Sequence, residues 1–301
     1  MTKINKTWFL FCGLVLGLLF IVVFPAARVI QSRSQVESVQ TDNHLRVENN
    51  AIYIDDREVY RFIPVDGGDA RLGGASSFSY SKGESIVYEY THQHIKSFLI
   101  GETPVTKELW EYVVADKMPE NPVGYYLYPH TFSYKDWFIF LVRLRELTGR
   151  SFRVPTKEEW EFAARGGIHS KDYIYSGSDN IEEVAYYKDN HPYPVGNSCF
   201  SRGKQKKPNE LGLFDMSGGV YELTSTHVYE SNPIFRNEYK TFLEKKERGE
   251  VLTGEDVEKL QFLESYICMG GAYDQPAEYC QLDRLPTHFP AVSGARIIME
   301  Y

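Results

Sequence analysis

The sequence contains only four cysteines, and they form no Cys-x-x-Cys pair. It also lacks an excess of basic residues, because 33 Lys and Arg stand against 41 Asp and Glu, for a formal net charge of −8. Nucleic-acid binding needs basic surface to meet phosphates, so this balance argues against a nucleic-acid partner. A Ser-His-Asp set, a phosphate-binding glycine loop, an internal repeat and a low-complexity segment are also missing, which argues against the corresponding enzyme and repeat classes.

One long apolar run lies near the start of the chain. Residues 7–27 carry no charge, and basic residues flank them on both sides. The run is about as long as a bilayer-spanning helix, whereas a signal peptide has a shorter apolar region and a small-x-small cleavage site. Since Pro25-Ala26-Ala27 is a poor cleavage site, we expect an uncleaved single-pass membrane anchor behind a short cytoplasmic tail, residues 1–6. Cleavage of the segment stays open as the alternative.

A stalk and one globular domain are predicted after the anchor. Residues 28–50 are mostly polar beyond the first few positions and show no sustained periodicity, so we interpret them as the stalk. The remainder, residues 51–301, is the predicted domain. Four of its early segments alternate or run apolar as strands do, namely 51–56, 58–63, 86–90 and 94–100.

Three helix starts are indicated by their capping residues. They are Thr106, Ser133 and Thr156, and the second has Asp136 three residues later. We expect the second helix to have one buried side, made of Trp137, Phe138, Phe140, Leu141, Leu144 and Leu147. From Gly166 onward the chain is mostly loop, and long irregular stretches in a compact domain are often functional.

A densely charged stretch, residues 235–266, interrupts this loop region. Two groups of apolar residues follow helical spacing within it, and Thr253 and Asp256 can cap the second group. We interpret the stretch as an inserted helical hairpin. Two roles stay open for the hairpin: a solvent-exposed insertion without a binding role, or a docking surface for a protein partner.

The most specific wording in the chain is Phe152-Arg-Val-Pro-Thr-Lys-Glu-Glu-Trp-Glu-Phe-Ala-Ala-Arg-Gly-Gly167. Thr156 can cap the first turn of a helix, Glu159 can complete a capping box, and the glycine pair can end the helix. The segment resembles the Arg-Leu-Pro-Thr-Glu-Ala-Glu-Trp-Glu core of the formylglycine-generating enzyme family, also called the sulfatase-modifying factor family.

Four further segments resemble the same family in the same order. They are 62–73, 97–106, 194–196 with 208–222, and 270–273 with 294–296. Together they identify the chain as a divergent member of the family. The resemblance implies that family's variant of the C-type lectin fold, an α+β domain with little regular secondary structure and with long loops, which are often held by calcium. Relatives include copper-dependent oxidases, iron enzymes of sulfur chemistry, and non-catalytic binding proteins.

The resemblance also implies where oxidase chemistry would lie. In the family, two thiolates that hold copper(I) stand two and seven residues after the aromatic residue of Gly-Gly-Ser-Trp. Counted from Tyr273, these positions are Gln275 and Cys280, so an amide replaces the first thiol. An amide is a poor copper(I) ligand and cannot carry out thiol redox exchange. Because Met269 and Ala272 replace the family's Arg and Ser nearby, we expect that the copper site is lost.

The other cysteines allow more than one interpretation. Cys268 could replace the lost thiol, although it lies before the glycine pair rather than after it. In an oxidising compartment, two of Cys199, Cys268 and Cys280 could also form a disulfide and leave one thiol over. The sequence does not select the pair, and three unpaired cysteines are the alternative.

Metal candidates are less specific. Calcium requires oxygen ligands, and Asp215 and Glu222 lie in the segment that contributes ligands in the family. Either residue could instead belong to a turn or a cap. His92 and His94 face one side of a predicted strand, but this spacing is more often incidental than metal-binding.

We therefore expect a membrane-anchored, extracytoplasmic family member that has lost oxidase chemistry and binds a protein or another ligand. A bacterial cell-envelope, secretion or gliding assembly fits the anchor and the hairpin. The residues expected to contact a ligand are Tyr273, Gln275 and Arg296. The alternative is an enzyme, either an oxidase that uses Cys280 or a metal-dependent enzyme acting on a sulfur compound. A carbohydrate-binding role is allowed by the fold, but no residue demands it.

Overall fold

The computed structural model describes residues 44–74, 77–80, 84–87, 90–115, 134–192, 203–231, 233–284 and 293–301. The predicted tail, anchor and most of the stalk lie outside these residues, as do Ser133, Cys199 and the segment 194–196. No helix of the described ranges is both long and apolar enough to cross a bilayer. The membrane anchor at residues 7–27 therefore stays a prediction.

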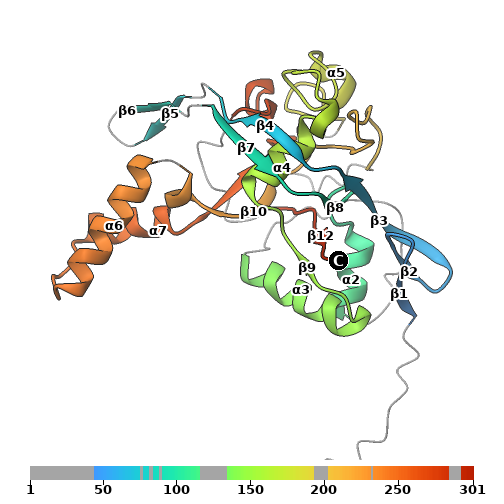
Figure 1. Ribbon diagram of the computed structural model, residues 1–301, viewed down its shortest axis with the longest axis horizontal. Helices are drawn as coiled ribbons and strands as arrows, with labels where there is room; N and C mark the ends of the chain where they lie inside the picture. Colours follow the sequence, from blue (N-terminus) through green and yellow to red (C-terminus); the bar gives the residue numbers. More distant parts are fainter. Residues whose placement is uncertain are drawn as a thin grey trace, which may run out of the picture. The chain divides into compact units, whose positions relative to one another are not determined.

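The largest sheet has six antiparallel strands in the order β1-β2-β3-β8-β12-β9 (Figure 1). Its strands are β1 Leu45–Glu48, β2 Ala51–Ile54, β3 Arg57–Val65, β8 Phe98–Gly101, β12 Ile298–Met299 and β9 Phe152–Arg153. Ile298 of β12 lies opposite both Ile100 and Arg153, so the end of the chain completes the interior of the sheet. This pairing carries the segment 294–296 into the core.

Strand β1 shows that the predicted end of the stalk was wrong. Residues 45–48, inside the predicted stalk of residues 28–50, pair with β2. Leu45 is 3% exposed and packs in the core, whereas Arg46 and Glu48 are exposed, because successive side chains of a strand point to opposite faces. Four alternating residues are too short a signal to stand out from polar neighbours.

Three two-stranded sheets complete the β structure among the described residues. They are β4 Gly68–Leu72 with β7 Thr91–Ile95, β5 Ser77–Tyr80 with β6 Glu84–Val87, and β10 Glu222–His227 with β11 Tyr266–Met269. The single strand predicted over 94–100 is therefore two strands, β7 and β8. It is interrupted at Lys96 and Ser97, because β7 pairs with β4 whereas β8 pairs with β3.

Helices cover the regions where capping residues predicted them. The α-helices are α2 Lys107–Ala115, α3 Tyr134–Thr148, α4 Lys157–Ala164, α5 Ile181–Val184, α6 Pro233–Glu247 and α7 Gly254–Leu263, and the 3-10 helices are η1 Gly167–His169, η2 Val228–Glu230 and η3 Ala277–Cys280. On α3, Trp137, Phe140 and Leu144 are buried as predicted, but Phe138 is 58% exposed. Phe138 follows Trp137 by one residue, which turns it by about 100° around the helix and away from the core.

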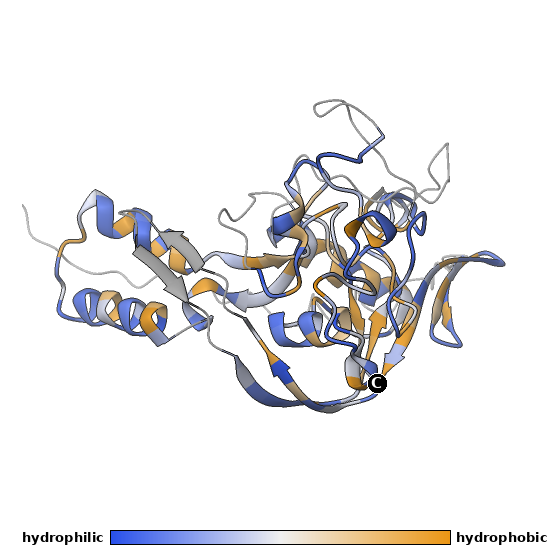
Figure 2. Cartoon of the chain, turned by 90° about the horizontal axis from the view of Figure 1, so that it is seen from above, coloured by the Kyte–Doolittle hydropathy of each residue, from blue (hydrophilic) through white to orange (hydrophobic). Residues whose placement is uncertain are grey.

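Two large clusters of buried side chains form the core. One surrounds Trp110 and Trp137, whose rings lie 4.8 Å apart, and packs α2 and α3 against the six-stranded sheet. The other surrounds Trp160 of α4 and includes Phe235 and Leu263 from the helical hairpin α6–α7. Figure 2 shows both hairpin helices carrying hydrophilic and hydrophobic residues in alternation. The hairpin thus packs on the core through one side.

Candidate functional site

The family's reactive loop corresponds to residues 270–280, which run from the end of β11 to η3. Gly270 and Gly271 have positive φ angles of 91° and 74°. A Cβ atom on Gly271 would lie 2.6 Å from the carbonyl oxygen of Tyr279 and 2.8 Å from Sγ of Cys280. Only glycine combines this conformation with this close approach. The reactive loop therefore folds back on itself, and its last residue packs against its second.

Cys280 lies at the end of the reactive loop and is 0% exposed. Burial raises the pKa of its thiol to about 12, although the backbone N–H groups of Ala272 and Gly218 point to the sulfur and lower it in part. Its neighbours are apolar or aromatic, namely Tyr175, Val184, Ala185 and Tyr187. Since the thiolate is the form that attacks and binds metals, Cys280 is held in its unreactive form at neutral pH.

Gln275 and Tyr273 are half-buried parts of the same loop. The Gln275 side-chain amide donates to the Asp274 carboxylate at 3.2 Å, and its backbone oxygen accepts from Lys188 N–H at 3.0 Å. The backbone N–H of Tyr273 donates to Gly219 O at 2.9 Å, which joins the loop to the family segment 208–222. At the position of the first thiol, the chain thus presents a hydrogen-bonding amide.

Cys268 lies on β11, opposite Leu223 of β10. It is 2% exposed, and burial raises the pKa of its thiol to about 12 as well. Cys268 and Cys280 are free thiols and belong to different clusters of the core. Cys268 and Cys280 therefore form no disulfide with each other, and Cys199 lies outside the described residues.

Arg296 and Glu222 form an ion pair that is buried completely, with 0% and 1% of their side chains exposed. Arg296 donates from Nε and Nη2 to the two Glu222 oxygens, each at 2.7 Å, and also to the carbonyl oxygens of Gly101 and Phe214. Trp160 Nε1 donates to Glu222 Oε2 at 2.8 Å. Two residues expected in binding roles are thus joined to each other and to the capped helix α4. A bidentate, hydrogen-bonded pair of this kind is a structural element of the core.

The proposed calcium ligands make protein contacts. Both Glu222 oxygens already accept hydrogen bonds, so a calcium ion there would have to displace Arg296. Asp215 has a φ of 58° and accepts from the Lys204 backbone N–H at 2.9 Å, as a turn residue does. Within the described ranges, no group of three or more His, Cys, Asp and Glu side chains could hold a metal ion. Calcium at Asp215 and Glu222 remains a prediction.

The two histidines of the predicted strand lie on β7 and are exposed. Nδ1 of His94 lies 2.8 Å from Oδ1 of Asp69 on the neighbouring strand β4. Cross-strand pairs of this kind are ordinary contacts of an exposed sheet surface. His92 and His94 therefore form a surface feature of the β4–β7 pair.

A protein-family model described as the sulfatase-modifying factor enzyme 1-like domain matches residues 52–286. The chain belongs to this family. The matched residues contain the reactive loop and α4 with its cap. The resemblance found in the sequence is thus confirmed, and the mixed α and β architecture agrees with it.

Curated relatives of this family member match shorter stretches. Chaperone protein LppX of Paenibacillus barcinonensis is 34% identical over 151 residues, covering 40% of this chain and 51% of the relative. Inactive C-alpha-formylglycine-generating enzyme 2 of Bos taurus is 31% identical over 94 residues, covering 29% of this chain and 31% of the relative. The formylglycine-generating enzyme of Mycobacterium tuberculosis is 31% identical over 124 residues, covering 38% and 36%. The chain thus spans between about a third and a half of their length.

Solved structures support the fold. Treponema denticola variable protein 1 aligns with a TM-score of 0.51 at 22% identity, over 80% of this chain and 95% of that one. PvdO from Pseudomonas aeruginosa aligns with a TM-score of 0.50 at 16% identity, over 80% and 94%. Likeness at this level of identity shows the shared fold alone.

Sequence reasoning missed the environment of the two thiols. The pKa of the Tyr221 phenol is raised, mainly by burial and then by the nearby Cys280, Asp274 and Cys268. The available signal was its place directly before Glu222 in a segment that resembles the family. A phenol with a raised pKa keeps its proton at neutral pH, so Tyr221 itself adds no charge beside the two thiols.

Proposed function

We propose that this chain is a membrane-anchored, extracytoplasmic family member that does not oxidise cysteine and instead binds a protein partner. The main support is the state of the two reactive positions: Gln275 carries an amide, and Cys280 carries a buried thiol with a pKa of about 12. Copper(I) is held by soft thiolate ligands, and the amide of Gln275 cannot supply one. Two relatives are named as an inactive enzyme and as a chaperone, which supports a binding role.

The anchor and the setting are part of the same proposal. Residues 7–27 are free of charge and long enough for a bilayer-spanning helix, which supports attachment to a membrane. The domain then lies outside the cytoplasm, in a bacterial cell-envelope, secretion or gliding assembly. A protease-protection assay on intact and on permeabilised cells tests this placement. Cleavage of the domain only after permeabilisation of the inner membrane would contradict it.

The hairpin α6–α7 is the surface proposed for the partner. Phe235, Phe242, Leu260 and Leu263 are buried in the core, so the hairpin is held in place. Four other apolar side chains are exposed: Ile234 at 56%, Leu243 at 39%, Val251 at 95% and Val257 at 41%. In this proposal, these exposed apolar side chains make the contact with the partner and become buried against it.

A co-purification experiment tests the partner. The full-length protein is solubilised in detergent and compared with the triple variant Leu243→Ser, Val251→Ser, Val257→Ser, which leaves the buried side of the hairpin unchanged. We expect a stoichiometric partner that is lost in the triple variant. The matched control changes Ile168 and Ile174 to Ser, since these are exposed at 52% and 49% away from the hairpin. Recovery of free protein from the wild type, or equal loss in the control, would contradict the proposal.

The second candidate is an oxidase that uses Cys280. It is favoured by the retained cysteine and by the two backbone N–H groups that reach its sulfur. Titration with copper(I) against a chromophoric chelator separates the two candidates. We expect no tight site in the wild type, whereas tight binding that disappears in Cys280→Ser would favour the oxidase.

A further inference from the structure

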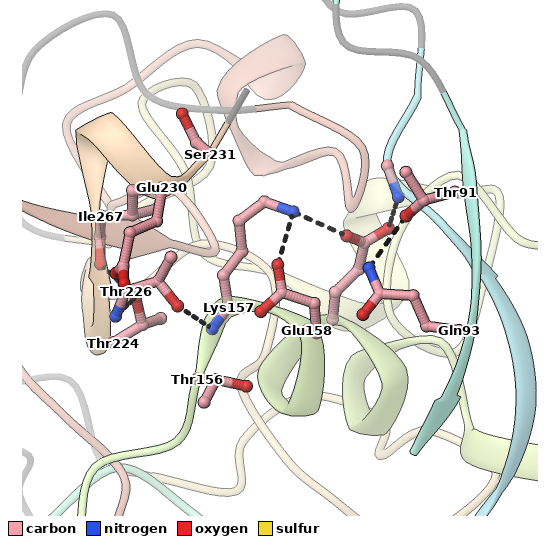
Figure 3. A network of polar contacts seen from close by, with 12 residues as sticks. Thr91, Gln93, Thr156, Lys157, Glu158, Thr224, Thr226, Glu230, Ser231 and Ile267 are labelled. Carbon is pink, nitrogen blue, oxygen red and sulfur yellow. Dashed lines mark hydrogen bonds and ion pairs between the residues drawn. The ribbon is translucent and has the colours of Figure 1, made fainter. Parts of the chain in front are cut away.

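A cavity of about 380 Å³ lies at the start of α4, outside the reactive loop. Its walls come from α4, β7, η2, the beginning of α6 and the segment that follows Cys280. Figure 3 shows the side chain of Lys157 in this region, above Glu158 of α4 and between Glu230 of η2 on one side and Thr91 and Gln93 of β7 on the other. The volume lies within the range of pockets that hold small molecules.

Lys157 is the unusual residue of the cavity, because only 10% of its side chain is exposed. Its Nζ forms ion pairs with Glu158 Oε1 at 3.6 Å and with Glu161 Oε2 at 3.8 Å, and both distances are too long for a hydrogen bond. Glu161 Oε1 instead accepts from Gly73 N and Arg165 Nε, each at 2.8 Å. An ammonium group has three protons to donate, so this buried cation has donor capacity left for an acceptor in the cavity.

The other charged groups of the cavity are mostly acidic. Glu158, Glu161, Glu230 and Asp283 line it, against Lys157 and Arg236. Asp283 is half-buried, and its contacts with described residues include no ion pair. The cavity therefore offers one buried cation for an oxyanion and an excess of carboxylates for a cation. Met269 and Leu282, both buried, add an apolar wall.

We propose that this cavity binds a free α-amino acid with an apolar side chain. Lys157 receives the carboxylate, Asp283 and Glu158 receive the ammonium group, and the side chain packs against Met269 and Leu282. A small zwitterion can pair with both the buried cation and the carboxylates of the cavity, whereas a simple anion or amine can pair with only one of them. Neither Gln275 nor Cys280 lines the cavity, so the inference does not depend on whether the oxidase chemistry is lost.

Isothermal titration calorimetry of the full-length protein in detergent tests the ligand class with three probes. L-leucine carries both charged ends, N-acetyl-L-leucine lacks the ammonium group, and L-leucinamide lacks the carboxylate. We expect L-leucine to bind, and each of the other two to bind at least about tenfold more weakly. Equal binding of N-acetyl-L-leucine indicates a peptide C-terminus and equal binding of L-leucinamide a peptide N-terminus. Either result, or no heat from L-leucine, would overturn the proposal.

Two variants locate the binding. Lys157→Gln and Asp283→Asn each remove one charge with little change in size, and each is expected to weaken L-leucine binding at least about tenfold. The control is Lys246→Gln, on the exposed side of α6 and outside the cavity. If Lys157→Gln fails to fold, Asp283→Asn still decides, because Asp283 is only half-buried. If a folded Asp283→Asn variant binds L-leucine as tightly as the wild type, the assignment of the site is wrong.

Discussion

The buried ion pair Arg296–Glu222 and the reactive loop come from segments that resemble the same family, yet they differ in what they retain. In the ion pair, residue identities and contacts are complete, and both carboxylate oxygens accept hydrogen bonds. In the reactive loop, the glycine turn is kept while the reacting positions hold an amide and a buried thiol. The comparison teaches that a scaffold and its chemistry are separable, so a matching scaffold does not establish activity.

The largest effect is expected from breaking the ion pair. Glu222→Gln keeps the shape of the side chain but leaves the fully buried Arg296 without its counter-charge, which costs about 3–5 kcal/mol of stability. The measurement is the free energy of unfolding from chemical denaturation. The control is Glu183→Gln, whose pair with Lys207 is exposed and contributes only about 0–1 kcal/mol. Similar losses in the two variants would show that Arg296 is not the cause.

A glycine pair tests whether the reactive loop is still tightly built. Gly271 and Gly219 have similar φ angles of 74° and 71°, but a Cβ atom meets the Tyr279 oxygen at Gly271 and nothing within 4 Å at Gly219. Alanine at either position costs about 1–2 kcal/mol for the left-handed conformation. We expect Gly271→Ala to cost about 1–3 kcal/mol more, because of overpacking. Equal unfolding free energies for the two variants would mean that the loop can relax.

The two capping boxes extend the comparison to the hairpin. Thr156 accepts from Glu159 N–H at 3.1 Å on α4, and Thr253 accepts from Asp256 N–H at 3.1 Å on α7. Removing either cap with Ala costs about 1 kcal/mol locally. We expect Thr156→Ala to lower global stability because most of α4 is buried, including the residues next to the cap. Thr253→Ala should speed amide exchange in α7 alone, because the buried residues of α7 lie at its other end. Hydrogen exchange followed by mass spectrometry separates the two outcomes, and global loss in Thr253→Ala would contradict the difference.

The smallest expected effect is a pH dependence of the cap on α7. Hydrogen bonds from Thr253 and then from Lys245 lower the pKa of Asp256 to about 2, from an ordinary value of 3.8. A carboxyl group with a lowered pKa adds stability above its unfolded pKa and loses it as pH falls through the folded value. The protection factors of the α7 amides, which correct for the intrinsic pH dependence of exchange, should therefore fall between about pH 4 and pH 2. If the Asp256→Asn variant shows the same pH dependence in α7, another titrating group is the cause.

Local patterns predicted part of this molecule well. The capping box at Thr156 and the glycines that end α4 depend on neighbouring residues, so their pattern is readable in sequence. The pairing of Glu222 with Arg296 joins positions 74 residues apart and follows from the sheet rather than from any local spacing. The cavity beside Lys157 is assembled from separate segments for the same reason. The burial of Cys280, which decides its protonation, is likewise a tertiary property.

The most direct test of the separation between scaffold and chemistry is an aldehyde assay. The folded full-length protein is incubated with copper, oxygen and a cysteine-containing sulfatase peptide, and the peptide is analysed by mass spectrometry. The formylglycine-generating enzyme of Mycobacterium tuberculosis serves as the positive control. No aldehyde is expected, because Gln275 supplies no thiolate at the first of the two reactive positions. Aldehyde formation by the wild type that vanishes in Cys280→Ser would contradict the account.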